Sequence, residues 1–162
     1  MAITKINNNA LSAVTTLPAG VGGKVLQTIS TIRATEITTS STSYVTTNCT
    51  ASITPSASSS KVLVTIAGAG RQDVAGGTAK YTVLRDSTAL GSNTATGFSE
   101  ISVTGGTYIK GSYGITFLDS PNSTSSVAYT LFMKNQTSST SCRACHNNTN
   151  TTVTLMEIAG WY

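Results

Sequence analysis

Charged residues are scarce in this chain, at 10% of its 162 residues, whereas an average soluble domain has about 25%. Ser and Thr make up about a third of the chain and supply the missing polarity, alternating with Val, Ile, Leu and Tyr. Such alternation of polar residues with β-branched and aromatic ones favours pleated strands over helices. The composition therefore predicts an all-β protein with a neutral surface.

Long apolar runs and clustered positive charge are also missing. No apolar run approaches the roughly 20 residues that a membrane-spanning helix needs. The N-terminal segment lacks the basic and apolar stretches of a secretory signal. The ten basic residues give a net charge of +4, but they stand singly and form no continuous groove for phosphates. We expect no membrane insertion and no nucleic-acid partner.

Residue types suited to catalysis are few. His146 is the only histidine, so any Ser-His-Asp or Cys-His arrangement would have to be built around it. Tyr108 and Phe98 lie beside glycine-rich turns and could stack on sugar rings, although core packing is the commoner role. We expect no enzymatic activity and no cofactor. The acidic residues are scattered, without a pair that indicates glycoside hydrolysis: Glu36, Asp73, Asp86, Glu100, Asp119 and Glu157.

One short motif has the spacing of a cofactor or metal site. The run from Cys142 to His146, Cys-Arg-Ala-Cys-His, matches the CxxCH signature of c-type haem attachment. Together with the distant Cys49, the residues Cys142, Cys145 and His146 also make a Cys₃His set for structural zinc. A Cys142–Cys145 or Cys49–Cys142 disulfide is a further alternative. Free, partly buried thiols are the favoured interpretation, and Cys142, Cys145 and His146 remain the metal candidates.

The chain divides into an arm at 1–22 and a domain at 23–162. The arm contains the polar run Asn7-Asn8-Asn9 and a glycine-rich stretch at 17–23. It has too few apolar residues to form a hydrophobic core of its own. We expect it to become ordered against a partner. Its expected anchor residues are Ile3, Ile6, Leu11, Val14 and Leu17.

From Lys24 onward, short stretches of alternating apolar and polar residues are separated by clusters of Gly, Asn, Ser and Pro. Such clusters are typical of the turns that connect the strands of β-hairpins. Gly68-Ala69-Gly70 and Gly76-Gly77 are interpreted as turn glycines. Eight or nine strands without a helix predict two packed antiparallel sheets. The expected strands are Lys24–Arg33, Tyr44–Ile53, Lys61–Gly70, Thr78–Leu90, Phe98–Val103, Tyr108–Leu118, Ser126–Lys134 and Thr151–Tyr162, with Ser139–Asn147 as either a strand or a loop.

Several expected strands are apolar on both faces, notably 61–67 and 153–158. In a monomeric antiparallel sandwich one face of each sheet faces water and is polar. Strands that are apolar on both faces therefore indicate packing against another subunit, and the apolar C-terminal end indicates the same. The expected interface residues are Leu63, Met156, Ile158, Trp161 and Tyr162.

Residues 23–160 resemble a domain of tailed-bacteriophage structural proteins, the C-terminal knob of fibre-like proteins. The resemblance implies a trimeric antiparallel β-sandwich, similar to the jelly-roll knobs of the tumour-necrosis-factor and C1q kind. A tail fibre normally has a long shaft, whereas this chain is nearly all knob. The likeness is carried by Gly23-Lys24-Val25-Leu26-Gln27, Thr50–Ser60 leading into Lys61-Val62-Leu63-Val64, Tyr81-Thr82-Val83-Leu84-Arg85-Asp86-Ser87-Thr88, and Thr154-Leu155-Met156-Glu157-Ile158-Ala159-Gly160.

This resemblance defines the expected function. It implies a non-enzymatic virion protein, a short homotrimeric fibre or spike whose arm attaches to a capsid, tail or collar protein. The knob would then bind a glycan or protein of the host surface. The alternative is a head decoration or cement protein that stabilises the capsid shell. Metal or haem binding through Cys142, Cys145 and His146 is a more remote alternative.

Overall fold

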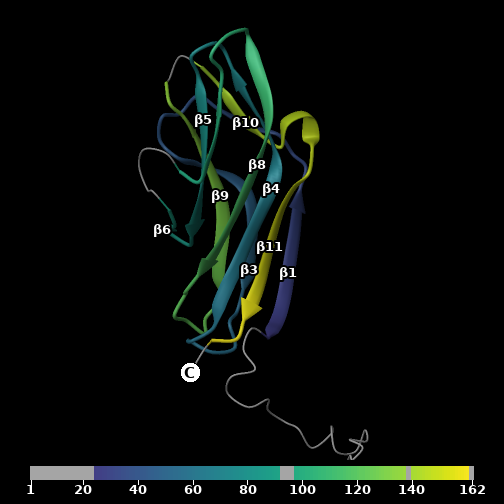
Figure 1. The fold of residues 1–162 in the computed structure, drawn as a ribbon, viewed down its shortest axis with the longest axis vertical. Helices are drawn as coiled ribbons and strands as arrows, with labels where there is room; N and C mark the ends of the chain where they lie inside the picture. Colours follow the sequence, from purple (N-terminus) through teal and green to yellow (C-terminus); the bar gives the residue numbers. More distant parts are fainter. Residues whose placement is uncertain (1–23, 92–96, 138–139, 161–162) are drawn as a thin grey trace, which may run out of the picture.

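The computed structural model describes residues 24–91, 97–137 and 140–160, which form two antiparallel β-sheets packed face to face (Figure 1). The predicted all-β fold of two antiparallel sheets is confirmed. Within the described residues the only helix is a 3₁₀ turn, η1 (His146–Asn148). The strands are β1 (Val25–Arg33), β2 (Ile37–Thr39), β3 (Val45–Ile53), β4 (Lys61–Asp73), β5 (Thr78–Arg85), β6 (Thr88–Ala89), β7 (Ser99–Ser102), β8 (Tyr108–Asp119), β9 (Val127–Asn135), β10 (Cys142–Ala144) and β11 (Thr151–Ile158).

Nested strand pairs build the two sheets. Sheet A has the order β1-β11-β4-β10-β2, with β8 also beside β4, and sheet B has the order β3-β9-β5-β6, with β7 also beside β5. Among the eight strands of at least four residues, the first pairs with the last (β1–β11) and the second with the seventh (β3–β9). The third pairs with the sixth (β4–β8) and the fourth with the fifth (β5–β7). The eight strands therefore form four nested antiparallel pairs, like one long hairpin. Folding of this hairpin places two of the pairs in each sheet.

The core lies between the sheets and follows the alternation of the sequence. Successive strand residues point to opposite faces, so β9 turns Val127, Tyr129, Leu131 and Met133 inward, and all four are buried. These are the residues that the pattern of Ser126–Lys134 places on one face. The inward residues of β4 and β11 meet them from sheet A, with Val62, Val64, Ile66, Val153 and Leu155 all buried.

Gly68 and Gly70 lie inside β4, so the interpretation of Gly68-Ala69-Gly70 as a turn is wrong. A Cβ on Gly68 would lie 2.6 Å from Tyr113 Oη, and one on Gly70 would lie 2.9 Å from the carbonyl oxygen of Arg143. The fully buried rings of Tyr81 and Tyr113 fill this space and stack with their centroids 4.4 Å apart. The Tyr81 hydroxyl donates a hydrogen bond to that Arg143 carbonyl at 2.7 Å. Glycine in β4 therefore makes room for tyrosine hydroxyls in the core.

The segment Ser139–Asn147, expected as either a strand or a loop, includes β10 and the start of η1. β10 pairs with β4 over Gly70–Gln72, just beyond the stretch of β4 that pairs with β11. β2, which the pattern does not predict, pairs with β10. Three residues are too few to show a period, and only the partner strand identifies β2. These short elements complete the end of sheet A at which the candidate site lies.

Candidate interaction face and ligand groove

The outer face of sheet A carries no charged side chain over its middle. On β4 this neutral face, as we call it, runs from Leu63 to Ala69, the outward residues between Lys61 and Arg71. Its width is four strands, and neutral hydroxyl, small and apolar side chains cover it. Its residues are Leu63, Thr65, Ala67 and Ala69 on β4, Thr28, Ser30 and Ile32 on β1, Thr152, Thr154 and Met156 on β11, and Ser112, Gly114, Thr116 and Leu118 on β8.

One row across the neutral face is apolar. Met156, Leu63 and Leu118 lie side by side on β11, β4 and β8. Leu118 is 57% exposed, and Ile32 on the edge strand β1 is 63% exposed. Leu63, Met156 and Ile158, which the sequence predicts as interface residues, are half-buried in the single chain. Large apolar side chains exposed on a flat face are typical of a surface that meets another protein.

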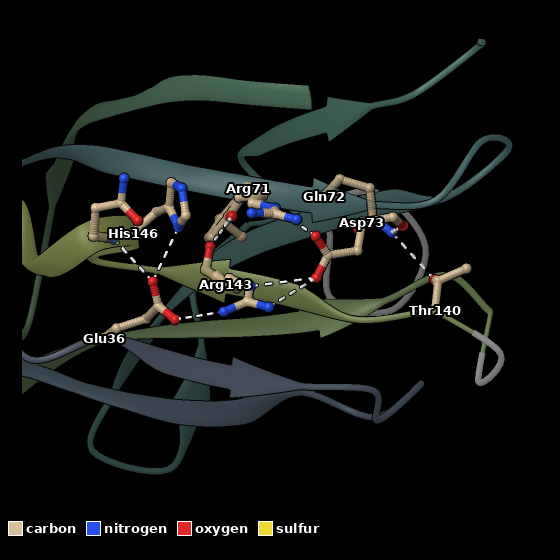
Figure 2. A network of polar contacts seen from close by, with 9 residues as sticks. Glu36, Arg71, Gln72, Asp73, Thr140, Arg143 and His146 are labelled. Carbon is tan, nitrogen blue, oxygen red and sulfur yellow. Dashed lines mark hydrogen bonds and ion pairs between the residues drawn. The ribbon is translucent and has the colours of Figure 1, made fainter. Parts of the chain in front are cut away.

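A chain of ion pairs crosses the other end of this face (Figure 2). Glu36, just before β2, accepts hydrogen bonds from Arg143 Nη1 at 2.6 Å and from His146 Nδ1 at 3.0 Å. Arg143 also reaches Asp73 Oδ2 at 3.3 Å, and Asp73 pairs with Arg71. Because the carboxylates are shared and partly buried, this network differs from isolated surface ion pairs, which contribute little. It ties the start of β2, the end of β4, β10 and η1 together.

The Glu36 carboxylate fixes the orientation of the His146 ring. Burial raises the pKa of Glu36, but hydrogen bonds from the Asn147 backbone N–H, Arg143 and His146 outweigh burial and lower the pKa below its ordinary value. Because the ionised carboxylate only accepts hydrogen bonds, Nδ1 of His146 must carry a proton. In the neutral ring, Nε2 is then a hydrogen-bond acceptor.

His146 lines a groove, and its Nε2 atom is buried and has no hydrogen-bond partner among the described residues. The side chain is only 6% exposed, and Nε2 lies on the side of the ring turned away from Glu36 (Figure 2). Buried polar atoms are nearly always hydrogen-bonded, and Nε2 is one of seven buried side-chain polar atoms that lack a partner among the described residues. The groove has a volume of about 320 Å³, and its lining includes Ala69, Lys110, Ser112, His146, Asn147 and Thr149.

Positive charge and one aromatic ring flank the groove. Arg143, Arg71 and Lys110 lie in one row across β10, β4 and β8. Arg71 Cζ is 4.2 Å and Lys110 Nζ is 5.7 Å from the ring centroid of Tyr108, which is 48% exposed. Phe98, the other aromatic considered for sugar stacking, is half-buried and stacks on Phe117 with centroids 4.7 Å apart. Tyr108 is thus the one of the two that is presented to solvent.

The three metal candidates have different surroundings. Cys142 is buried in the core on β10, Cys145 contacts Cys49 with 3.7 Å between the two Sγ atoms, and His146 bonds to Glu36. In the part of the chain that the structure describes, no group of three or more His, Cys, Asp or Glu side chains is placed to hold a metal ion. All three thiols are free. They are fully rather than partly buried.

Two acidic residues that looked scattered in the sequence have specific partners. Glu36 and His146 are 110 positions apart, and no spacing rule identifies such a pair. Glu157 is fully buried and accepts hydrogen bonds from Gln27 and Ser56. A signal for Glu157 is present in the sequence, because it shares an inward-facing alternation with Val153 and Leu155. A charge at an inward position of a strand predicts a buried, hydrogen-bonded carboxylate.

Several predicted residues lie outside the described part of the chain: the anchors Ile3, Ile6, Leu11, Val14 and Leu17, and the interface residues Trp161 and Tyr162. Among the described residues, no helix has the length and apolar character that crossing a membrane requires. No protein-family model matches this chain, and a search of curated proteins finds no match.

Proposed function

We propose that this chain is a non-enzymatic structural protein of a tailed-bacteriophage virion, a short homotrimeric fibre or spike. Residues 1–22 attach it to a capsid, tail or collar component, and residues 23–162 form a β-sandwich knob that binds the host surface. The observation that carries the proposal is the neutral face of sheet A, because such a face can pack against another subunit without burying unpaired charge.

The nested strand pairs support a jelly-roll assignment for the knob. A jelly roll has eight strands in two sheets joined as two Greek keys. The pairs β1–β11, β3–β9, β4–β8 and β5–β7 are those of a long hairpin rolled into this form. Jelly rolls recur in viral capsid and lectin domains. The topology therefore agrees with both a virion location and the binding of surface glycans.

The composition of the neutral face supports self-association. Interface cores are depleted in charged residues, and this face has none from Leu63 to Ala69 along β4. Leu118 on β8 and Ile32 on β1 add exposed apolar area at the two edges. Burial of that area in a trimer removes it from water, at about 25 cal/mol for each square ångström.

Leu118→Glu tests this face directly. Because Leu118 is 57% exposed, a single sandwich tolerates the new charge, whereas a packed interface would bury it unpaired at a cost of about 3–5 kcal/mol. We expect the wild-type protein to have the mass of three 16.6 kDa chains. We expect the variant to have the mass of one chain. Light scattering after size-exclusion chromatography measures both.

Ser52→Glu is the matched control, because Ser52 is an exposed strand residue on sheet B. This variant should remain trimeric. A monomeric wild type, or a Leu118→Glu variant that stays trimeric, would contradict the assignment of the neutral face. A cooperative thermal unfolding transition of the monomeric variant, starting from a β-rich native baseline, distinguishes dissociation from misfolding.

The groove beside His146 supports the host-binding part of the proposal. Lys110 lines the groove and can donate a hydrogen bond to a sugar hydroxyl, and an exposed aromatic ring such as Tyr108 offers a stacking surface for the sugar face. The groove volume of about 320 Å³ lies at the small end of ligand pockets. A groove of this volume can hold one sugar unit of a longer glycan.

Saturation-transfer NMR with galactose, N-acetylglucosamine and glucuronate tests this site. We expect at least one sugar to bind, and His146→Ala, which removes part of the groove wall, to weaken binding about tenfold. Ser112→Tyr should also abolish the signal by filling the groove, while Ser52→Ala on sheet B should leave it unchanged. Absence of transfer to all three sugars, or equal transfer in His146→Ala, would remove the groove from the proposal.

Hydrolysis is the second candidate function, because the Glu36–His146 pair has the geometry of the orienting half of a general-base relay. A hydrolase also needs a nucleophile within reach of Nε2, and this atom is buried, with no side-chain hydroxyl among the described residues bonded to it. We therefore prefer binding. Cleavage of nitrophenyl glycosides or esters by the wild type, lost in His146→Ala, would reverse that preference.

A head decoration protein remains the alternative location within the virion. It would use the same sandwich but would contact capsid subunits instead of the host. Electron microscopy of particles labelled with an antibody against the knob separates the two locations, since label on the tail or collar supports a fibre or spike. Label spread over the head would support the decoration role.

A further inference from the structure

Cys49 and Cys145 lie in contact across the core. Their Sγ atoms are 3.7 Å apart although the residues are 96 positions apart, and each residue is at most 1% exposed. Cys49 belongs to β3 of sheet B, and Cys145 follows β10 of sheet A. A disulfide bond is about 2.05 Å long, so the two sulfurs would have to approach by about 1.6 Å. Small rotations of both side chains can share this movement.

Both cysteines lie where regular strand geometry breaks. The β3–β9 register shifts between Thr46 and Cys49, and Asn48 has a positive φ of 57°. Cys145 itself has a positive φ of 52° at the junction of β10 and η1. At such irregularities the backbone can adjust with less disturbance than inside a continuous ladder. The local geometry therefore permits the sulfurs to close the remaining distance.

We propose that Cys49 and Cys145 form an intramolecular disulfide when the folded protein meets an oxidant of the peroxide class. The Cys145 sulfur attacks one peroxide oxygen, the O–O bond breaks, and Cys145 becomes a sulfenic acid while its thiol proton leaves in water. The Cys49 sulfur then attacks Cys145 Sγ, the S–O bond breaks, and a second water leaves with the Cys49 proton. Two thiols and one hydrogen peroxide thus give one disulfide and two waters. This inference does not depend on the proposed virion function.

Cys145 is the better first nucleophile because its sulfur is surrounded by polar groups. Its Sγ lies 3.3 Å from Thr151 Oγ1, which in turn lies 2.6 Å from Tyr113 Oη. The hydrogen bond with Cys49 lowers the pKa of Cys145, burial raises it, and the Thr151 contact lowers it again, so that the net shift is downward. Burial raises the pKa of Cys142 to about 12, which keeps that thiol protonated and unreactive.

Peptide mapping of peroxide-treated protein tests the pairing without any substitution. Trypsin cuts after Arg33, Lys61, Lys134 and Arg143, so the three cysteines fall in separate peptides, 34–61, 135–143 and 144–162. After treatment with hydrogen peroxide, alkylation and digestion, we expect peptide 34–61 linked to peptide 144–162. The linked pair should have the mass of the two peptides less two hydrogens. Peptide 135–143 should carry the alkyl label.

Any other linkage, or alkylation of all three peptides after peroxide treatment, would overturn the proposal. Because the cross-link closes a long loop and joins the two sheets, it should raise the melting temperature by about 5–10 °C, and dithiothreitol should reverse the rise. Cys142→Ala should keep the linkage and the shift, whereas Cys145→Ala should lose both. If Cys145→Ala fails to fold, the wild-type peptide map still decides.

Discussion

Gly70→Ala is expected to destabilise the folded protein by about 4 kcal/mol. Overpacking of a core costs about 1–3 kcal/mol, and a buried polar group that loses its partner costs about 1–3 kcal/mol more. Both costs apply here, because the new Cβ would lie 2.9 Å from the Arg143 carbonyl oxygen and would displace the Tyr81 hydroxyl that donates to it. Tyr81 cannot withdraw, since it is fully buried and stacked on Tyr113.

Gly105→Ala supplies the control for this prediction. Gly105 lies in the connection between β7 and β8, where a Cβ meets nothing within 4 Å, and neither glycine has a positive φ. The control should be neutral or stabilised by up to about 1 kcal/mol, because Ala restricts the unfolded chain. Urea unfolding of the two variants measures the difference. Equal stabilities would mean that the Tyr81 hydroxyl does not depend on the space at Gly70.

The alternation of apolar and polar residues was sufficient to predict the longer strands. Inward and outward faces differ chemically along Val127–Asn135 and Lys61–Asp73, and a period of two identifies such strands without any knowledge of partners. The same alternation predicts Leu63 and Met156 as interface residues, and both are half-buried and point outward from sheet A. Their role in an interface stays a prediction, because a single chain holds no partner.

The pattern failed where a residue's role depends on a distant partner. Gly68 and Gly70 look like turn residues locally, and only the hydroxyls of Tyr113 and Tyr81 explain them as strand residues. The contact of Cys49 with Cys145 depends on how the sheets pack. In both cases the relevant neighbour lies far along the sequence, in a region that local periodicity does not reach.

Several of the few charged residues connect the ends of strands. Arg85 pairs with Asp119 at 2.6 Å, and the buried Tyr129 donates to the same carboxylate at 2.7 Å. Asp86 accepts from the backbone N–H of Ala128 at 3.0 Å. Acidic side chains of this domain thus fasten the ends of strands to one another, leaving the middle of sheet A neutral.

Glu157→Gln is expected to cost about 3 kcal/mol near neutral pH, because the carboxylate holds one end of the sandwich together. Glu157 is fully buried and accepts from Gln27 Nε2 at 2.7 Å, from the Ser56 backbone N–H at 2.7 Å and from Ser56 Oγ at 2.6 Å. These donors come from β1 and from the connection between β3 and β4. The two Ser56 donors share one carboxylate oxygen and Gln27 bonds to the other, so a glutamine would turn its N–H₂ group toward at least one donor and leave buried polar groups unpaired.

The pH dependence of this effect identifies the carboxylate as its source. Burial raises the pKa of Glu157, but hydrogen bonds from Ser56, Gln27 and Ser60 outweigh it and lower the pKa to about 2 from an ordinary 4.5. A lowered folded-state pKa means that the stabilisation is complete above pH 4.5 and is lost as the pH falls toward 2. The stability gap between wild type and Glu157→Gln should therefore narrow by about 2–3 kcal/mol between pH 7 and pH 2.5. Urea unfolding at pH 7, 4 and 2.5 measures it. Glu100→Gln, at an exposed position of β7, is a control that should change stability little at any pH. A gap independent of pH would show that Glu157 acts through its shape and not through its charge.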